Sequence, residues 1–82
     1  MYFLEWKEPA VRQLDKLDPS IASRIVLKVE KLKENLLSQD IKKLKGEEAF
    51  RLRVGDYRVI FEINQNTISI LKVGHRQHIY DR

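Results

Sequence analysis

The chain has 82 residues, no cysteine and a formal net charge of +4, with 43% hydrophobic and 34% charged residues. This length suits one modest core in a single domain over residues 1–82, and the lack of cysteine excludes disulfides, thiolate metal sites and thiol nucleophiles. No segment is apolar enough to span a bilayer, and the first residues do not resemble a signal peptide. We therefore expect a soluble cytoplasmic domain that makes no membrane contact.

The first predicted elements are a strand and two helices. Residues 2–6 are aromatic and apolar and indicate a short strand. Pro9 and Pro19 stand where the first turn of a helix tolerates proline, and Asp18 is placed to cap the second helix. Apolar side chains recur at helical spacing after each proline: Ala10, Leu14 and Leu17 in the first helix, and Ile21, Ile25, Val29, Leu32 and Leu36 in the second. These residues predict a helical hairpin with a short joint.

The second half of the sequence predicts a basic loop and three strands. Residues 38–48 indicate a loop, and residues 50–54 then alternate apolar and basic side chains. Gly55-Asp56 is a two-residue hairpin turn with glycine first, as a type II′ turn prefers, and Gln65-Asn66 is a second turn between strands at 57–64 and 67–73. Taken together, the predicted elements indicate an α+β fold. It consists of an N-terminal strand, a two-helix hairpin and a three-stranded antiparallel meander, with the helices packed on one sheet face.

The charge is segregated, because residues 1–40 are neutral and residues 41–82 carry the whole +4. A segregated basic surface suits a polyanion, nucleic acid first and an anionic membrane second, although an ordinary solvated surface is the alternative. If Val54 pairs with Tyr57 across the turn, Arg53 lies opposite Arg58 and all the strand arginines share the face away from the helices, together with Ile60, Leu71 and Val73. Opposed like charges destabilise a sheet. We therefore expect a phosphate site there, and loss of Arg58 should leave stability unchanged or slightly improved. The alternative is that these arginines pair with Asp56 or Glu62.

The segment after the last strand, Gly74–Tyr80, adds basic side chains and an aromatic ring that could stack on a base. His75 and His78 are three residues apart, and on an extended chain their rings would point to opposite sides. No acidic residue is spaced to complete a metal site with them, so we expect neither a metal nor a cofactor.

Several of these motifs together resemble the RelE toxins of the RelE/ParE toxin–antitoxin superfamily. The motifs are Leu44–Gly46, Phe50–Phe61, Val73–Arg76 and Ile79–Tyr80, and the resemblance covers nearly the whole chain. It implies a RelE-like fold and a type II toxin that acts as a metal-independent mRNA interferase, cutting mRNA in the ribosomal A site by attack of a 2′-hydroxyl on the adjacent phosphate. It also implies a RelB-like antitoxin partner in a heteromeric complex. The alternative is a ParE-like gyrase inhibitor or a non-catalytic nucleic-acid-binding module of the same fold.

The resemblance also implies roles for individual residues. Arg58 matches an arginine that stabilises the phosphate, Arg76 one that stabilises the transition state or leaving group, and Tyr80 a tyrosine that orients the base or nucleophile. Arg53 stands where some relatives have a lysine that is a proposed general base; an arginine there can position the phosphate but cannot take the proton. Either Tyr80 or His75 takes the proton, or the ribosome supplies the positioning and the reaction tolerates a weak base. The expected catalytic residues are Arg58, Arg76, Tyr80 and Arg53, and the expected RNA-binding residues are Lys42, Lys43, Lys45, Arg51 and His75.

Overall fold

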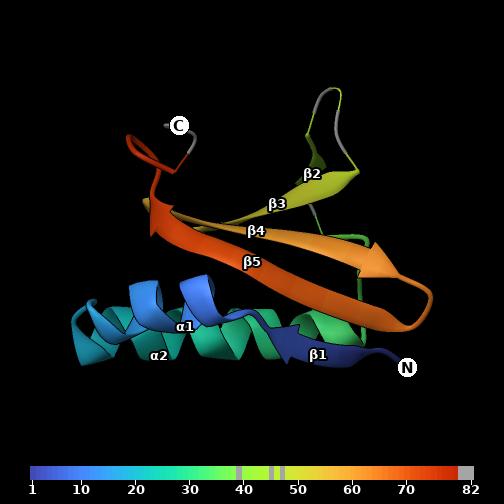
Figure 1. Cartoon of the computed structure of the whole chain (residues 1–82), viewed down its shortest axis with the longest axis horizontal. Coiled ribbons are helices and arrows are strands. Elements are labelled where there is room, and N and C mark those ends of the chain that lie inside the picture. Colours follow the sequence, from blue (N-terminus) through green and yellow to red (C-terminus); the bar gives the residue numbers. More distant parts are fainter. Residues whose placement is uncertain (39, 45, 47, 80–82) are drawn as a thin grey trace.

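The structure is a computed structural model, and it describes residues 1–38, 40–44, 46 and 48–79. Its elements, in chain order, are β1 (Phe3–Trp6), α1 (Glu8–Asp15), α2 (Pro19–Glu30), the 3-10 turn η1 (Lys31–Lys33), β2 (Ile41–Lys43), β3 (Ala49–Val54), β4 (Tyr57–Asn64) and β5 (Thr67–His75). Both helices lie against the same face of the sheet (Figure 1). The predicted α+β class, with a helical pair on one sheet face, is confirmed.

The strand order in the sheet is β1-β5-β4-β3-β2. β3, β4 and β5 form the predicted antiparallel meander, while β1 pairs with β5 in parallel. The prediction of a loop over residues 38–48 is wrong in part, because β2 lies within it and pairs with β3 in antiparallel fashion. A three-residue lysine-rich segment has no strand pattern of its own, and only the pairing with β3 makes it a strand.

The two prolines mark the helix starts as predicted. Asp18 occupies the N-cap position of α2, but its side chain makes no capping hydrogen bond. Its backbone carbonyl instead accepts a hydrogen bond from the N–H of Ala22 at 2.9 Å, the first bond of the helix. Within the residues that the structure describes, no helix is both long and apolar enough to cross a membrane.

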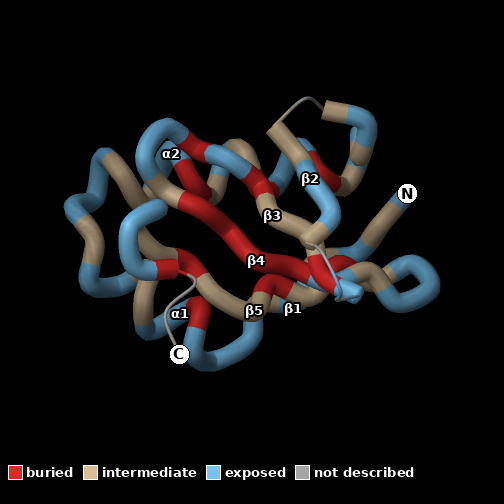
Figure 2. Tube along the Cα trace, turned by 90° about the horizontal axis from the view of Figure 1, so that it is seen from above, coloured by how far each residue is buried: buried red, intermediate tan, exposed pale blue. Residues whose placement is uncertain are grey.

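The core lies between the helices and the inner face of the sheet. Figure 2 shows β4 in the middle of the sheet, buried over residues 58–61. The largest fully buried side chains are Phe61, Ile25, Leu32, Leu52, Ile68, Ile70, Val29 and Val59. Phe50 packs at the margin of this core, with its ring stacked on that of Phe61 at a centroid distance of 5.5 Å. The predicted helix stripe and the predicted strand alternation therefore meet in one core.

A β-bulge changes the face of the last part of β5. Ile60 pairs with Lys72 but the next residue, Phe61, pairs with Ile70, which leaves Leu71 without an opposite partner. An extra residue in one strand reverses the alternation of the residues that follow it. The expectation that Val73 lies on the face away from the helices is therefore wrong, because Val73 is buried in the main core. Leu71 does lie on the outer side, against Ile60.

This packing predicts the effect of core truncation. Leu52 is 1% exposed, whereas Leu27 on α2 is 65% exposed. We expect Leu52→Ala to lower the free energy of unfolding by about 2–5 kcal/mol, because it leaves a cavity in the core. Leu27→Ala is the matched control and should change it by less than about 0.5 kcal/mol. Chemical denaturation of both variants tests this, and equal effects would contradict the described core.

Candidate functional site

The sheet face turned away from the helices, hereafter the open face, carries two rows of mostly basic residues. Directly opposed residues share a face. The first row is Lys42, Arg51, Ile60 and Lys72, and the second is Arg53, Arg58 and Gly74. The predicted register, with Val54 opposite Tyr57 and Arg53 opposite Arg58, is confirmed. It gathers on one surface basic residues that are far apart in the sequence.

Arg58 is held by the β3–β4 turn rather than standing free on the sheet. Its residue is 9% exposed, and Nη1 donates hydrogen bonds to the carbonyls of Gly55, at 2.8 Å, and of Tyr57, at 2.9 Å. The buried Nε has no hydrogen-bond partner among the residues that the structure describes. Arg58 bonds two carbonyls of its own hairpin and does not stand free beside Arg53. We therefore revise the expectation for this residue and predict that its loss lowers stability.

The same turn also holds Arg76. Its backbone N–H donates to the carbonyl of Asp56 at 2.8 Å, and its Nε lies 3.8 Å from Asp56 Oδ1. The Arg76 side chain is 57% exposed. The two-residue turn thus brings together two arginines that stand 18 positions apart in the sequence, with the guanidinium of Arg58 largely buried and that of Arg76 open to solvent.

Arg53 pairs with Asp40, a residue that sequence reasoning missed. Its Nη2 and Nε lie 2.9 and 3.2 Å from Asp40 Oδ1, and its backbone N–H donates to the Asp40 carbonyl at 2.8 Å. Asp40 Oδ2 accepts a hydrogen bond from Lys28 Nζ on α2. The predicted alternative partners, Asp56 and Glu62, do not pair with Arg53. No local pattern reveals Asp40, because it reaches Arg53 only through the pairing of β2 with β3.

The opposite end of the open face is acidic. Glu62 lies opposite Ser69, and Ser69 lies opposite Glu5 of β1. The Ser69 hydroxyl donates to Glu5 Oε1 at 3.2 Å, and Lys7 Nζ lies 3.2 Å from the same oxygen. The positive charge of the open face is therefore concentrated over β2, β3 and the adjoining ends of β4 and β5.

An apolar residue of the C-terminal segment packs on the open face. Ile79 is 4% exposed and lies in a small cluster with Ala49 and Ile60. Its N–H donates to the carbonyl of His75 at 2.9 Å, which turns the chain back over the sheet. A Cβ at Gly74 would lie 3.1 Å from Ile79 Cδ1, so a larger residue at 74 would require the Ile79 side chain to shift by a few tenths of an ångström.

Two of the predicted RNA-binding residues do not point to the open face. Lys43 lies opposite Phe50 and His75 opposite Tyr57, and both partners pack against the main core. The expectation that the two histidine rings point apart is also wrong. The chain turns at residues 76–79, so the rings of His75 and His78 lie 6.2 Å apart.

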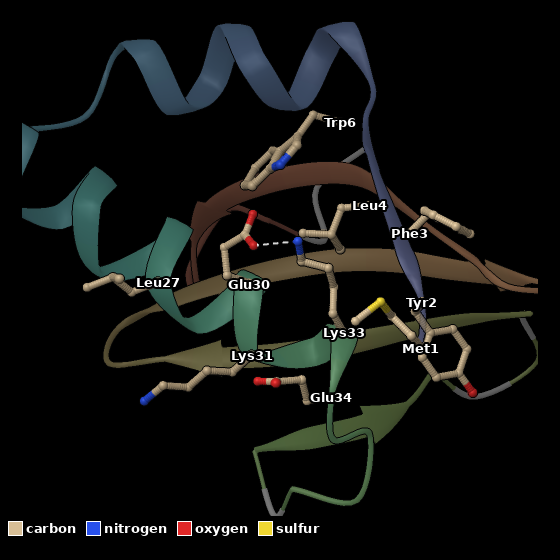
Figure 3. Close-up of a pocket in the computed structure, with 10 residues that line it drawn as sticks. All are labelled: Met1, Tyr2, Phe3, Leu4, Trp6, Leu27, Glu30, Lys31, Lys33 and Glu34. Atoms are coloured by element: carbon tan, nitrogen blue, oxygen red, sulfur yellow. Dashed lines mark ion pairs between the residues drawn. The ribbon is translucent and has the colours of Figure 1, made fainter.

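A groove lies on the other side of the molecule, between β1 and α2–η1 (Figure 3). Its volume is about 780 Å³, and its lining residues are Met1, Tyr2, Phe3, Leu4, Trp6, Leu27, Glu30, Lys31, Lys33 and Glu34. Leu4 and Trp6 come from β1, and Leu27 comes from α2. Lys33 Nζ lies 2.8 Å from Glu30 Oε1 within the groove. Phe3 and Leu27 are 66% and 65% exposed, so this side of the molecule has an apolar surface open to solvent.

Comparison with known proteins agrees with the fold and with the motifs. Residues 4–80 match the model of a family described as the ParE toxin of the type II toxin–antitoxin system parDE. Toxin RelE3 of Methanocaldococcus jannaschii is 41% identical in an alignment 76 residues long, and the match covers 87% of this chain and 86% of that protein. This chain belongs to the RelE-type toxins of type II toxin–antitoxin systems.

Two solved structures of complexes have the same fold as this toxin. In the RelB–RelE antitoxin–toxin complex from Methanococcus jannaschii, the matching chain is 36% identical with a TM-score of 0.79, over 94% of this chain and 95% of that one. In the archaeal RelE–RelB complex from Pyrococcus horikoshii, the identity is 28% and the TM-score 0.81, over 94% of this chain and 97% of that one. The predicted RelE-like fold is therefore confirmed.

The structure brings together part of the residue set that the RelE resemblance implies. Arg58 and Arg76 meet at the β3–β4 turn, and Arg53, Arg51 and Lys42 share the open face with Arg58. Lys45 and Tyr80 lie outside the described residues, so their predicted roles stay predictions.

The contacts of Asp40 predict how the stability of the toxin depends on pH. Hydrogen bonds from Lys28 and then from Arg53 hold the pKa of Asp40 below its ordinary value of 3.8. A carboxyl group whose pKa is lower in the folded state stabilises the fold above the unfolded-state pKa, and this contribution disappears as the pH falls through the folded-state pKa. Asp40→Asn should therefore melt at a lower temperature than the parent toxin at neutral pH, and the two should converge below about pH 4.

Thermal melts of the two proteins over a pH series measure this convergence. Asp15→Asn, at the exposed end of α1, controls for the change in net charge. A difference between the parent and Asp40→Asn that stays constant down to the lowest pH would mean that the carboxylate charge of Asp40 is not what stabilises the fold.

Proposed function

We propose that this toxin is a ribosome-dependent endoribonuclease that cleaves mRNA in the ribosomal A site without a metal or cofactor. The 2′-hydroxyl of the mRNA attacks the adjacent phosphorus, and the bond from phosphorus to the 5′-oxygen breaks. The products are a 2′,3′-cyclic phosphate and a 5′-hydroxyl. One proton leaves the 2′-oxygen and one reaches the 5′-oxygen, so the reaction is balanced without a redox partner. The observation that carries the proposal is the pair of arginines, Arg58 and Arg76, held by one turn at the edge of a basic sheet face.

Fixed guanidinium groups suit this chemistry. Negative charge builds on the non-bridging oxygens as the 2′-oxygen attacks, and donors that are already in place stabilise it without reorganising. Arg58 is fixed in place by the carbonyls of Gly55 and Tyr57. Arg76 is more exposed and lies at the same turn, and we propose that it contacts the same phosphate or the leaving oxygen. Arginine remains charged at neutral pH and can contact two phosphate oxygens at once.

The contacts of His75 limit its part in proton transfer. Its Nδ1 accepts a hydrogen bond from the N–H of Gln77 at 3.2 Å, so the neutral ring carries its proton on Nε2. Its ring lies edge-on to Tyr57, on the side of the sheet opposite Arg58. This geometry does not favour His75 as the general base. Either Tyr80 takes the proton, or the ribosome positions the mRNA and the reaction tolerates a weak base. The described residues then contribute mainly by orienting the mRNA and stabilising charge.

The alternative is a ParE-like gyrase inhibitor. The matching family is described by ParE toxins, and this description favours the alternative. The similarity to proteins named RelE and the arginine pair at the turn favour mRNA cleavage. Induced expression separates the two: cuts in translated mRNA support the nuclease, whereas intact mRNA with DNA damage would support gyrase inhibition.

Single-turnover cleavage of ribosome-bound mRNA tests the arginine pair. We expect Arg58→Ala and Arg76→Ala each to slow cleavage on the order of a hundredfold, because each removes a donor to charge that grows in the transition state. Rates are compared per folded molecule, since Arg58→Ala also loses two hydrogen bonds to the turn. The matched control is Arg12→Ala, because Arg12 is an exposed residue of α1. This variant should cleave mRNA at the parent rate. If Arg58→Ala cuts normally per folded molecule, the arginine is structural and the proposed site is wrong.

We also propose that a RelB-like antitoxin binds this toxin in a heteromeric complex and places an apolar segment in the groove between β1 and α2–η1. Two of the matching solved structures are RelB–RelE complexes. The groove exposes Leu27 and Phe3, and large exposed apolar patches mark protein interaction sites. Acidic residues elsewhere in the same antitoxin would complement the basic open face.

Leu27 gives a direct test of this binding site. We expect Leu27→Asp to weaken binding of the antitoxin encoded beside this toxin by at least about tenfold, because it places a charge against the apolar segment. Leu37→Asp is the matched control, since Leu37 is 92% exposed and does not line the groove. Isothermal titration calorimetry measures the affinity of each variant for the antitoxin. Equal affinities for the two variants would place the antitoxin elsewhere on the toxin.

A further inference from the structure

Two cationic side chains of the toxin, Lys28 and Arg53, form ion pairs with the carboxylate of Asp40. One carboxylate oxygen of Asp40 accepts hydrogen bonds from Nη2 and Nε of Arg53, and the other accepts one from Lys28 Nζ. The Asp40 backbone is fixed as well, because its carbonyl accepts the Arg53 N–H at 2.8 Å and its N–H donates to the Ser38 hydroxyl at 3.1 Å. Asp40 thereby connects α2, the start of β2 and the end of β3 at one carboxylate.

This network orients Arg53. The edge of its guanidinium formed by Nε and Nη2 is occupied by Asp40, whereas Nη1 has no hydrogen-bond partner among the described residues. The Arg53 side chain is 55% exposed and that of Asp40 only 22%, so the occupied edge is covered and the rest of the group is open to solvent. Arg53 also lies opposite Arg58, and two such cations would move apart without a nearby negative charge.

We propose that Asp40 is a positioning residue for Arg53: it fixes one edge of the guanidinium so that the remaining N–H groups face a phosphate on the open face. The proposal rests on the proposed function. A long side chain that is free in solution has many rotamers, and holding it in one of them removes an ordering cost when the phosphate binds. Asp40 does this at an electrostatic cost, since its negative charge lies beside the path of a polyanion.

The two effects of Asp40 predict opposite changes in rate and in affinity. Without the carboxylate, the open face is more positive and mRNA should bind at least as tightly. Arg53 is then no longer held, and a misplaced catalytic group costs rate rather than affinity. If Asp40 were only structural, its loss would lower the fraction of folded, active toxin. The cleavage rate and the mRNA affinity of the molecules that remain folded would be unchanged.

The experiment measures single-turnover cleavage of ribosome-bound mRNA over a range of toxin concentrations, for the parent, Asp40→Ala, Asp40→Asn, Arg53→Ala and the double variant. We expect Asp40→Ala to lower the maximal rate per folded molecule by about 10- to 100-fold, with half-saturation unchanged or at lower concentration. Asp40→Asn keeps an oxygen that can accept from Arg53, and its rate should lie between those of the parent and Asp40→Ala. In the Arg53→Ala background, Asp40→Ala should have no further effect on the rate.

Three results would overturn the proposal. The first is a parent-like rate for Asp40→Ala, and the second is the same fold loss with and without Arg53. The third is a higher rate for Asp40→Ala, which would make Asp40 only a counter-charge to Arg53. Asp15→Asn controls for the loss of one negative charge and should cut at the parent rate.

A second readout is independent of cleavage. The Nε–H of Arg53 should give a protected NMR signal in the parent toxin and lose that protection in Asp40→Ala, because the hydrogen bond to Oδ1 is gone. If the parent toxin does not cut mRNA at all, the proposed function fails while this signal still tests whether Asp40 holds Arg53. If the signal is unprotected in the parent toxin, the positioning role fails whatever the activity.

Discussion

The two-residue turn between β3 and β4 is the constraint on which the open face depends. Gly55 has φ +59, and Asp56 does not share this left-handed conformation, which is the arrangement of a type II′ turn. A turn of this length fixes which residues of β3 and β4 stand opposite each other. It also offers the carbonyl of Gly55 to Arg58 and the carbonyl of Asp56 to Arg76. One tight turn therefore sets the register of the hairpin and anchors both arginines of the proposed phosphate site.

The sheet divides its two faces between stability and function. On the helix side, large apolar residues such as Phe61, Ile70 and Leu52 are almost fully buried and supply the main driving force for folding. On the open side, Arg53 lies opposite Arg58, and the Nε groups of Arg51 and Arg58 are buried without partners among the described residues. Buried donors without partners cost stability, and such local costs are concentrated at functional sites. The core on the helix side stabilises a fold that can carry them.

Asp40 shows how part of this cost is relieved. It places one negative charge beside Arg53, which leaves Arg58 to the carbonyls of the turn. The two opposed arginines are thus held by different partners, Arg53 by a carboxylate and Arg58 by backbone carbonyls. This separation lets a sheet keep two cations in directly opposite positions, where a pair of free side chains would repel. It also means that the two guanidinium groups differ in burial, with Arg53 more open to solvent than Arg58.

The sequence by itself determined both helices, the strands other than β2, the register of the β3–β4 hairpin and the face on which the arginines lie. These follow from local rules: helix periodicity, prolines at helix starts, two-residue turns and the alternation of a strand. Tertiary structure alone decided the rest. Val73 lies on the helix side of the sheet and not on the predicted open face, because the extra residue Leu71 reverses the alternation of β5. Nothing in the local sequence marks that bulge. Lys43 and His75 lie on the face opposite to the open face, because each shares a face with its pairing partner. Those partners, Phe50 and Tyr57, pack against the main core. Asp40 joined the site because β2, three residues long, became a strand only by pairing with β3, and that pairing depends on contacts between distant segments that no single stretch of sequence encodes.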